Sequence, residues 1–312
     1  MSAIVVGVDG GGTKTRVLVA DETGKTIGEA EGPASAVRPG KADHSATVIA
    51  DTVRRALGDA ELGLIVPRVL CVGVAGVGRE PERQALWQAL AAMELADEVL
   101  VHPDATIALD DAFNDGVGVL LIAGTGSVAF GRGPTGVIAR TGGWGPNIGD
   151  EGSGAWIGRR ALSVVTAASD GREPETALTG AVLTATQVND VNDLIAWAAE
   201  ATPAMLATIA PAVISEAEAG DLRANSLLSM AAEELVLHVR ALARQLFMDE
   251  RAAVPVALTG GLLKRGTPLR KRLEQRMRSA VPGAQLHAAE IDAARGAVRD
   301  ALRALSGESL RA

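Results

Sequence analysis

Apolar residues near the start of the chain fall into short uninterrupted runs, and each run ends at glycine or at a polar turn. Residues 4–8, 16–20 and 26–31 therefore predict three consecutive strands. The pattern returns about a hundred residues later at residues 116–123, 128–131 and 137–140, again with glycine-rich turns. This repetition predicts two similar domains that each open with a three-strand meander and face one another across a cleft.

The rest of the chain alternates between helical and strand-like spacing of apolar positions. We expect helices at residues 45–57, 81–93, 268–279 and 292–305, and strands at residues 68–74, 98–101, 254–258 and 285–287. The stretch from residue 154 to about 248 is alanine-rich and mostly helical, with segments at 190–201, 203–219 and 222–248. Strands that alternate with helices after each meander favour mixed sheets flanked by helices, which is the α/β class.

Two glycines stand out against this background. Gly296 lies inside the last predicted helix, where glycine is unfavourable unless another segment packs closely. We expect Gly76 and Gly296 to lie where helices between the domains cross.

Length and charge limit the classes of function. A chain of 312 residues exceeds the usual length of one domain, and 47% hydrophobic with 22% charged residues is typical of a folded enzyme. The net charge of −8 argues against a nucleic-acid partner. The cations near the end are interpreted as the solvated face of a helix; they are Lys264, Arg265, Arg270, Lys271 and Arg272.

Cysteine and histidine usage points to a reducing compartment and away from structural metal. The single cysteine, Cys71, lies in an apolar run, which predicts a buried thiol and a cytoplasmic protein. The four histidines show no ligand spacing, so no structural zinc is expected. The apolar N-terminus is too short for a membrane span and lacks a basic lead, so no membrane partner is expected.

The first glycine-rich turn carries the clearest chemistry. A strand delivers Asp9 onto three consecutive glycines and then onto Thr13, Lys14 and Thr15. Glycines let backbone N–H groups approach phosphate oxygens, and a carboxylate can hold a hydrated Mg²⁺. A plain hairpin turn is the alternative. Because a strand follows the turn and the lysine does not follow the last glycine directly, it is not a Walker loop.

Two later turns strengthen the phosphate reading. Gly124, Thr125, Gly126 and Ser127 follow a matching strand in the second half of the chain. Residues 259–261, a threonine and two glycines, end another strand; alone they would be a simple strand-to-helix connection, but beside two phosphate turns we expect them to hold adenosine.

Asp104 follows a strand and Pro103, which places it where α/β proteins build their sites. It could also be the N-cap of the next helix. The nearby Asp110, Asp111 and Asp115 are expected to be solvated.

The stretch at residues 142–154 combines glycines with Trp144 and the vicinal carboxylates Asp150 and Glu151. Such carboxylates suit hydrogen bonds to sugar hydroxyls. Capping of the following helix is the alternative, but it does not account for the glycines.

On these residues the chain resembles the N-acetylglucosamine kinase group of the actin-like ATPase superfamily, within the wider set that includes the benzoyl-CoA reductase activator ATPases. The resemblance covers nearly the whole chain and rests on the order and spacing of several motifs. They are residues 9–15, 102–105, 123–127, 143–153, 259–261 and the helix around 293–297.

The resemblance implies a fold and a set of roles. It implies two ribonuclease-H-like domains with mixed five-stranded sheets and a central cleft, one formed by residues 1–115 plus 293–312 and the other by residues 116–292 with a helical insertion. It implies an ATP- and Mg²⁺-dependent sugar kinase, usually a homodimer, in which Asp104 is the catalytic base. The residues implied to bind ATP are Asp9 (through Mg²⁺-bound water), Gly11, Gly12, Thr13, Lys14, Thr15, Gly124, Thr125, Gly126, Ser127, Thr259, Gly260 and Gly261. Those implied to contact the sugar are Ser35, Ala36, Asp104, Thr125, Gly143, Trp144, Gly145, Asp150 and Glu151.

Two departures keep the acceptor open. Sugar-binding members carry Asn at the position of Ala36, and some carry Asn at the position of Val128. Losing both amides weakens the case for N-acetylglucosamine specifically, so the resemblance implies an amino sugar of the N-acetylglucosamine, glucosamine or muramic type, or another hexose. An iron–sulfur activator would need cluster-ligating cysteines that a lone Cys71 does not supply. A sugar-sensing regulator would need a DNA-binding segment, and we expect none before Ile4.

Overall fold

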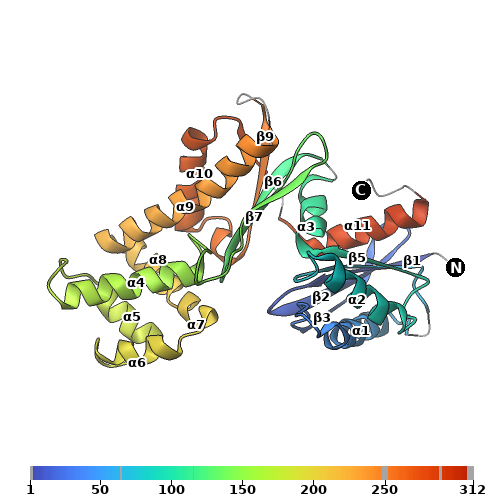
Figure 1. Ribbon diagram of the computed structural model, residues 1–312, viewed down its shortest axis with the longest axis horizontal. Helices are drawn as coiled ribbons and strands as arrows, with labels where there is room; N and C mark the ends of the chain where they lie inside the picture. The colour runs from blue at the N-terminus through green and yellow to red at the C-terminus, as the bar shows by residue number, and fades with distance from the viewer. Residues whose placement is uncertain (1–2, 64, 115, 248–251, 288–289, 308–312) are drawn as a thin grey trace. The chain divides into compact units, whose positions relative to one another are not determined.

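The computed structural model describes residues 3–63, 65–114, 116–247, 252–287 and 290–307, and its chain divides into two compact units (Figure 1). The first unit consists of Met1–Gly116 with Glu290–Ala312, and the second of Val117–Ala289. None of the described helices is long and apolar enough to cross a membrane.

The first unit is built on a five-stranded mixed sheet with the order β3-β2-β1-β4-β5. Its strands are β1 (Ile4–Gly10), β2 (Lys14–Asp21), β3 (Thr26–Pro33), β4 (Val69–Val74) and β5 (Glu98–Pro103). The first three pair antiparallel, whereas β4 pairs parallel with both β1 and β5. The carboxyl ends of β1, β4 and β5 therefore meet at one edge of the sheet.

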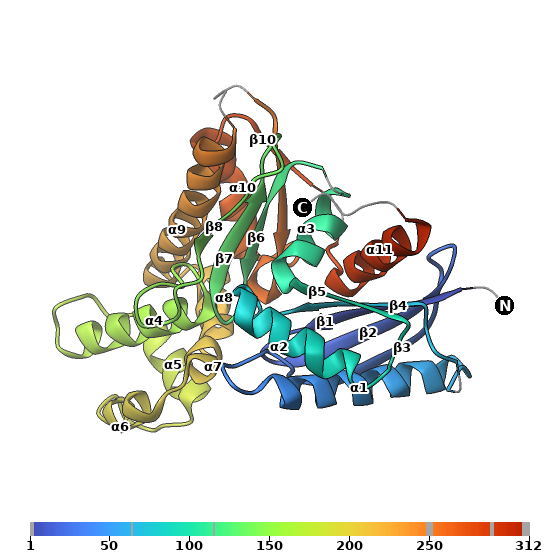
Figure 2. The ribbon, with the colours of Figure 1, turned by 45° about the vertical axis from the view of Figure 1, so that its right-hand side comes forward.

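Helices cover both faces of this sheet (Figure 2). One face packs against α1 (Ala42–Asp59) and α2 (Glu80–Ala91), and the other against α3 (Asp104–Phe113) and α11 (Ala293–Ser306). Because both faces are buried, β4 reads as a continuous apolar run rather than an alternating one.

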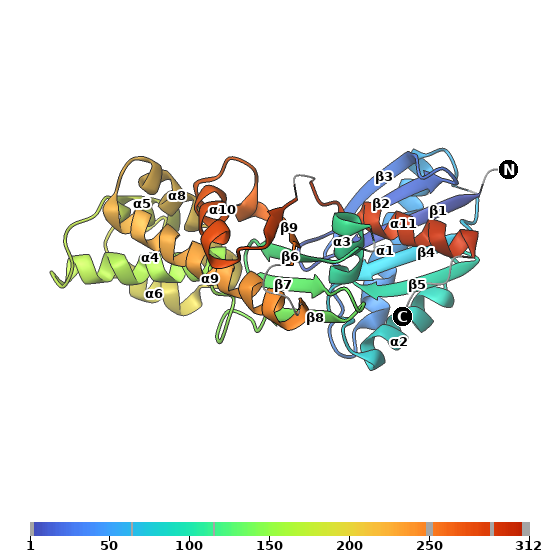
Figure 3. The same ribbon diagram turned by 90° about the horizontal axis from the view of Figure 1, so that it is seen from above.

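The second unit repeats the arrangement with the order β10-β9-β6-β7-β8. Its strands are β6 (Gly118–Ala123), β7 (Ser127–Arg132), β8 (Ile138–Gly142), β9 (Val254–Thr259) and β10 (Ala284–Leu286). The helices are α4 (Gly154–Ser169), α5 (Leu178–Thr186), α6 (Asp193–Glu200), α7 (Pro203–Ala207), α8 (Ala210–Glu218), α9 (Leu222–Leu246) and α10 (Pro268–Ala280), with a short 3-10 turn η1 (Gly261–Leu263). Helix α9 packs against β6, β7 and β8 (Figure 3).

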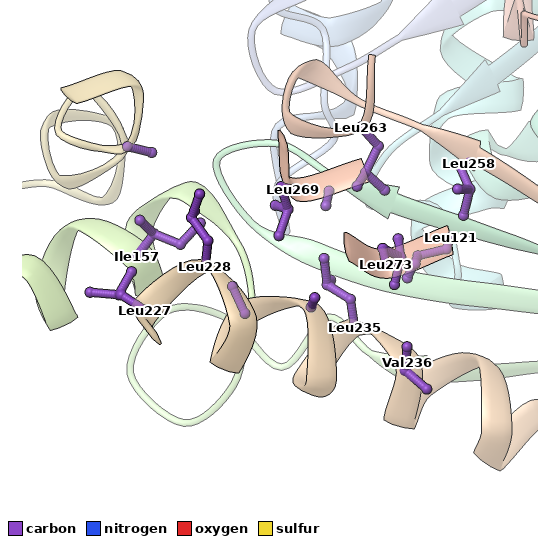
Figure 4. Packing of buried hydrophobic residues seen from close by; sticks show 14 of the residues in the cluster. Leu121, Ile157, Leu227, Leu228, Leu235, Val236, Leu258, Leu263, Leu269 and Leu273 are labelled. Carbon is purple, nitrogen blue, oxygen red and sulfur yellow. The ribbon is translucent and has the colours of Figure 1, made fainter. Parts of the chain in front are cut away.

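The core of the second unit depends on the apolar stripe of α9. Leu228 and Leu235 on this helix are buried, as are Leu121 of β6 and Leu273 of α10. Figure 4 shows these side chains converging from the helices and the sheet. The core is mainly aliphatic because only 2% of the residues in the chain are aromatic.

The predicted class, mixed five-stranded sheets flanked by helices, is confirmed, but the helix expected at residues 203–219 is wrong. The structure has two helices there, α7 and α8. Pro211 lies in the first turn of α8. Proline has no N–H and its ring clashes with the carbonyl four residues earlier, so one continuous helix would be broken near Ala207.

The carboxylates expected to be solvated after Asp104 are instead buried. Asp110 and Asp111 are only 3% and 6% exposed. Asp111 accepts two hydrogen bonds of 2.7 Å from the Arg295 guanidinium and one of 2.7 Å from the Asp292 N–H, so it joins α3 to the start of α11. Asp115 lies outside the described residues.

The cationic segment near the end also differs from the expectation. Lys264 and Arg265 precede α10 rather than lying on it. Arg270 is 8% exposed and donates to Glu274 and to the Leu263 carbonyl. It therefore ties the helix to the preceding turn instead of facing solvent.

The close packing expected at Gly296 is confirmed, but not between domains. A Cβ at Gly296 would lie 1.9 Å from the carbonyl oxygen of Ile107, so α11 and α3 touch through backbone within the first unit. Gly76 is not in a helix at all. It follows β4 with φ of +93°, and a Cβ there would lie 2.1 Å from the Val37 carbonyl oxygen.

Replacing Gly296 with Ala should destabilise the protein by about 2–4 kcal/mol, because the forced separation of α3 and α11 outweighs the gain in helix propensity. Gly58→Ala is a matched control, since Gly58 lies in α1 with no atom near its would-be Cβ. That variant should gain about 0.5–1 kcal/mol. Urea denaturation of both variants measures the difference; equal stabilities would contradict the packing argument.

Candidate functional site

The first glycine turn joins β1 to β2 and leaves backbone N–H groups at its tip. Gly11 N–H donates to the Lys14 carbonyl at 2.9 Å and closes the hairpin. Within the described part of the chain, Gly12 and Thr13 donate to no backbone carbonyl. A Cβ at Gly12 would meet no atom within 4 Å, so the turn is open to a ligand. Such a tip fits phosphate oxygens.

The side chains of Lys14 and Thr15, which follow the tip of the turn, contact other parts of the first unit. Lys14 pairs with Glu31 on the neighbouring strand and is largely exposed. Thr15 is fully buried, and its hydroxyl lies 2.6 Å from the Pro33 carbonyl and 2.7 Å from the Ser35 hydroxyl. The structure thus places the Thr15 side chain inside the unit, where it anchors β3 behind the turn; phosphate contact by Lys14 or Thr15 stays a prediction.

The loop after β3 lies against the same turn. Ser35 and Ala36 both donate their N–H groups to the Gly11 carbonyl, at 3.1 and 3.2 Å. Ser35 is buried and leaves no space at Gly10, where a Cβ would lie 2.6 Å from its hydroxyl oxygen. The predicted sugar-contacting residues Ser35 and Ala36 are therefore next to the predicted phosphate turn.

Asp9 lies at the end of β1 in a negatively charged setting. Burial raises the pKa of its carboxyl to about 6, and repulsion by Asp104 and Asp292 contributes. Carboxylates that repel one another in a partly buried place are stabilised by a divalent cation. Asp9 therefore fits the predicted role of a magnesium anchor.

Asp104 is the first residue of α3, directly after β5. The expected N-cap role is wrong, because the capping position is Pro103 and no side chain caps this helix. Burial raises the pKa of the Asp104 carboxyl, although the N–H of Ala105, which donates to it at 2.9 Å, partly offsets this. A carboxylate whose pKa is raised towards neutral is a better proton acceptor.

The second glycine turn joins β6 to β7 and is held from behind by the start of α4. Gly124 N–H donates to the Gly126 carbonyl at 2.9 Å. Gly154 and Ala155 donate to the carbonyls of Gly124 and Thr125, at 2.8 and 3.1 Å. The turn's carbonyls thus face the helix.

Ser127 ties this turn to the loop that follows β8. Its buried hydroxyl donates to the Glu151 carbonyl at 2.7 Å, and its own carbonyl accepts from Gly143 N–H at 3.0 Å. The predicted phosphate turn and the predicted sugar loop are one hydrogen-bonded assembly.

Asp150 occupies a strained position in that loop. Its φ is +58°, a left-handed conformation that is uncommon for any residue but glycine, and it is 9% exposed. A Cβ at Gly126 would lie 2.8 Å from an oxygen of the Asp150 carboxylate. The carboxylate is therefore held directly against the second turn.

The helix after the loop is not capped by Asp150 or Glu151. The N-cap of α4 is Ser153, whose hydroxyl accepts from Trp156 N–H at 3.2 Å. Because the Asp150 carboxylate does not cap the helix, it can bind a ligand. Trp144 on the same loop is 66% exposed, and Gly145 beside it has φ of +90°.

The third turn is adjacent to the second. Thr259 ends β9, which pairs parallel with β6, and a Cβ at Gly260 would lie 2.2 Å from the Ala123 carbonyl oxygen. Gly261 starts η1 and has open space at its Cα. The two turns predicted to hold phosphate and adenosine thus belong to one edge of the second unit's sheet.

One cluster was missed by the sequence reasoning. Ligand atoms of Cys71, His102 and Asp300 lie within 4.8 Å of one another on the face of the first sheet that packs against α11. Asp300 pairs with Arg303 at 2.8 Å. Burial, with repulsion by Asp300 and Asp110, raises the pKa of the Cys71 thiol well above its ordinary value. The three residues come from segments that are distant in the sequence, so no local spacing of residues predicts the cluster.

A family model matches residues 6–301, which is nearly the whole chain. This chain belongs to the BadF/BadG/BcrA/BcrD ATPase family. The resemblance inferred from the motifs is therefore confirmed, and ATP use follows from the family.

The chain is also similar to individual proteins that are named as amino sugar kinases. The N-acetyl-D-glucosamine kinase of Dictyostelium discoideum is 30% identical over 313 residues, covering 96% of this chain and 98% of the relative. The N-acetylmuramic acid/N-acetylglucosamine kinase of Clostridium acetobutylicum is 29% identical over 94% of this chain and 96% of the relative. The solved structure of a candidate N-acetylglucosamine kinase from Chromobacterium violaceum superposes with a TM-score of 0.78 at 32% identity, covering 96% and 98% of the two chains.

Proposed function

We propose that this protein is an ATP-dependent kinase that phosphorylates a hydroxyl group of an amino sugar. One observation carries the proposal: Asp104, a partly buried carboxylate with a raised pKa, is close enough to repel Asp9 at the strand ends of a chain that aligns over nearly its full length with named amino sugar kinases. The acceptor is of the N-acetylglucosamine, glucosamine or N-acetylmuramic acid type, as the relatives' names suggest.

The transfer needs little covalent chemistry from the protein. The sugar oxygen bonds to the γ-phosphorus, the bond from that phosphorus to the β–γ bridging oxygen breaks, and ADP leaves with the electron pair. Asp104 accepts the proton of the attacking hydroxyl. Asp150, held against Gly126, orients the sugar ring through its hydroxyls.

The cofactors are ATP and Mg²⁺. The N–H groups of the two glycine turns bind the phosphates, and residues 259–261 hold adenosine. Asp9 would hold Mg²⁺ through water, and a bound ion would neutralise charge on the phosphates. The fit rests on the charge around Asp9, which a divalent cation would relieve. A homodimer and a cytoplasmic location are also part of this prediction.

A coupled ADP-release screen tests the proposal. Purified protein with ATP and Mg²⁺ should release ADP when N-acetylglucosamine, glucosamine or N-acetylmuramic acid is added, and much more slowly without sugar. Excess EDTA is the control for the metal, and glucose tests the need for the amino group. If no amino sugar stimulates ADP release, the proposed function is wrong.

A further inference from the structure

The cation beside the sugar loop is Arg140, which lies over an aromatic ring. Arg140 lies in the middle of β8 and is exposed, with its guanidinium carbon 5.2 Å from the centre of the Trp144 ring. The Arg140 side chain takes part in no hydrogen bond or ion pair with the described residues. Its donors are therefore free to bind a ligand.

The ring beneath it is both exposed and fixed. Trp144 is 66% exposed, although a large apolar ring in a loop would normally be covered. Its loop is held at both ends: Gly143 donates to Ser127, and Arg159 donates to the Pro146 carbonyl at 2.7 Å. A rigid exposed ring in a predicted sugar loop is a platform for a ligand.

The surface next to the platform is apolar rather than polar. A Cβ at Gly143 would lie 2.9 Å from a Val128 methyl group and 4.0 Å from an Arg140 nitrogen. Val128 offers no hydrogen bond, whereas the guanidinium beside it can recognise a polar substituent. Arginine presents a planar set of donors that matches a carboxylate in two parallel hydrogen bonds.

We propose that Arg140 and Trp144 form a subsite for a carboxylate on the acceptor, so that the substrate class is an amino sugar with an acidic substituent. The proposal rests on the proposed function and deepens it. Trp144 contacts the substituent's apolar atoms, and Arg140 binds its carboxylate. The carboxylate takes no part in phosphoryl transfer, so the subsite acts mainly on KM.

The matched control is present in the chain. Arg160 lies 5.3 Å from the centre of the Trp156 ring in α4, which is a second arginine–tryptophan pair of the same unit outside the loop. Arg160→Gln removes the same charge from the same kind of contact. Arg140→Lys keeps the charge but loses the two-donor geometry.

The experiment compares three acceptors: N-acetylmuramic acid, the same sugar with its carboxylate converted to a carboxamide, and N-acetylglucosamine. The wild type should prefer the acid over the carboxamide. Arg140→Gln should lower kcat/KM for the acid relative to the carboxamide by about 10- to 100-fold, chiefly through KM, and Arg140→Lys by less. Arg160→Gln should leave the ratio unchanged.

The outcomes separate this inference from the proposed function. If the acid is not phosphorylated while N-acetylglucosamine is, or if Arg140→Gln leaves the ratio unchanged, the subsite is wrong and the kinase assignment stands. If none of the three sugars is phosphorylated by the wild type, the proposed function itself fails and the subsite with it.

Discussion

Replacing Asp104 with Asn should lower amino-sugar-dependent ADP release by about 10²- to 10⁴-fold. Asparagine has nearly the same shape, and its carbonyl can still accept the Ala105 N–H at the start of α3. It cannot accept a proton from the attacking hydroxyl. The loss should therefore appear in kcat, with binding of ATP measured by calorimetry little changed.

The pH dependence of the wild type follows from the same group. Burial raises the pKa of Asp104 above the ordinary value of 3.8. Only the ionised form of Asp104 accepts a proton, so kcat should fall as the pH is lowered. The midpoint of that fall should lie above the pKa of an ordinary aspartate. The part of the acid limb set by Asp104 should be absent from the residual activity of Asp104→Asn, which leaves the part set by ionisation of Asp9.

Asp43→Asn is the control for charge removal at a helix start, because Asp43 lies in the first turn of α1 and is exposed. It should retain wild-type turnover. If Asp104→Asn also turned over at a near-normal rate, Asp104 would not be the catalytic base, whatever the other residues do.

The strands were predictable because their signals are local. Apolar runs that end in glycine turns carry both the element and its boundaries, and the strands of the two meanders differ from the prediction by at most two residues at either end. Gly296 was informative for the same reason: a helix tolerates glycine poorly, so its presence indicates a close neighbour. What the pattern could not tell is which element supplies that neighbour, and the crossing proved to lie within one unit.

The failures concern partners that are distant in sequence. Asp111 looks like one of several acidic residues at a helix end, but Arg295, 184 positions away, makes it a buried junction. Pairing of Lys14 with Glu31 and burial of Thr15 likewise depend on the register of β2 with β3. The left-handed conformation of Asp150 has no local signal, since glycine would be the ordinary choice there.

Replacing Asp9 with Asn should remove Mg²⁺-dependent activity and yet make the protein more stable. At neutral pH the ionised Asp9 carboxylate is held in a partly buried place near Asp104 and Asp292, which raises its pKa to about 6. An ordinary aspartate in the unfolded chain has a pKa near 3.8. The wild-type folded state therefore loses stability as the pH rises through this window, and a neutral side chain avoids the loss.

The expected gain in the free energy of unfolding is about 1–3 kcal/mol at pH 7.5, measured by urea denaturation in the presence of EDTA. The gain should shrink as the pH falls through this window and vanish well below 3.8, where the wild-type carboxyl is protonated in both states. Asp43→Asn should show no such gain. Binding of Mg²⁺–ATP, followed by calorimetry, should weaken in Asp9→Asn.

These two readouts test one physical cause. An ionised carboxylate that is partly buried beside other carboxylates lowers the free energy of unfolding. We infer that Asp9 is present despite this cost because it binds a cation. If Asp9→Asn were no more stable than the wild type, the electrostatic setting inferred for Asp9 would be wrong. If the variant were more stable but bound and used Mg²⁺–ATP normally, the electrostatic surroundings inferred for Asp9 would be confirmed, and another residue would have to bind Mg²⁺.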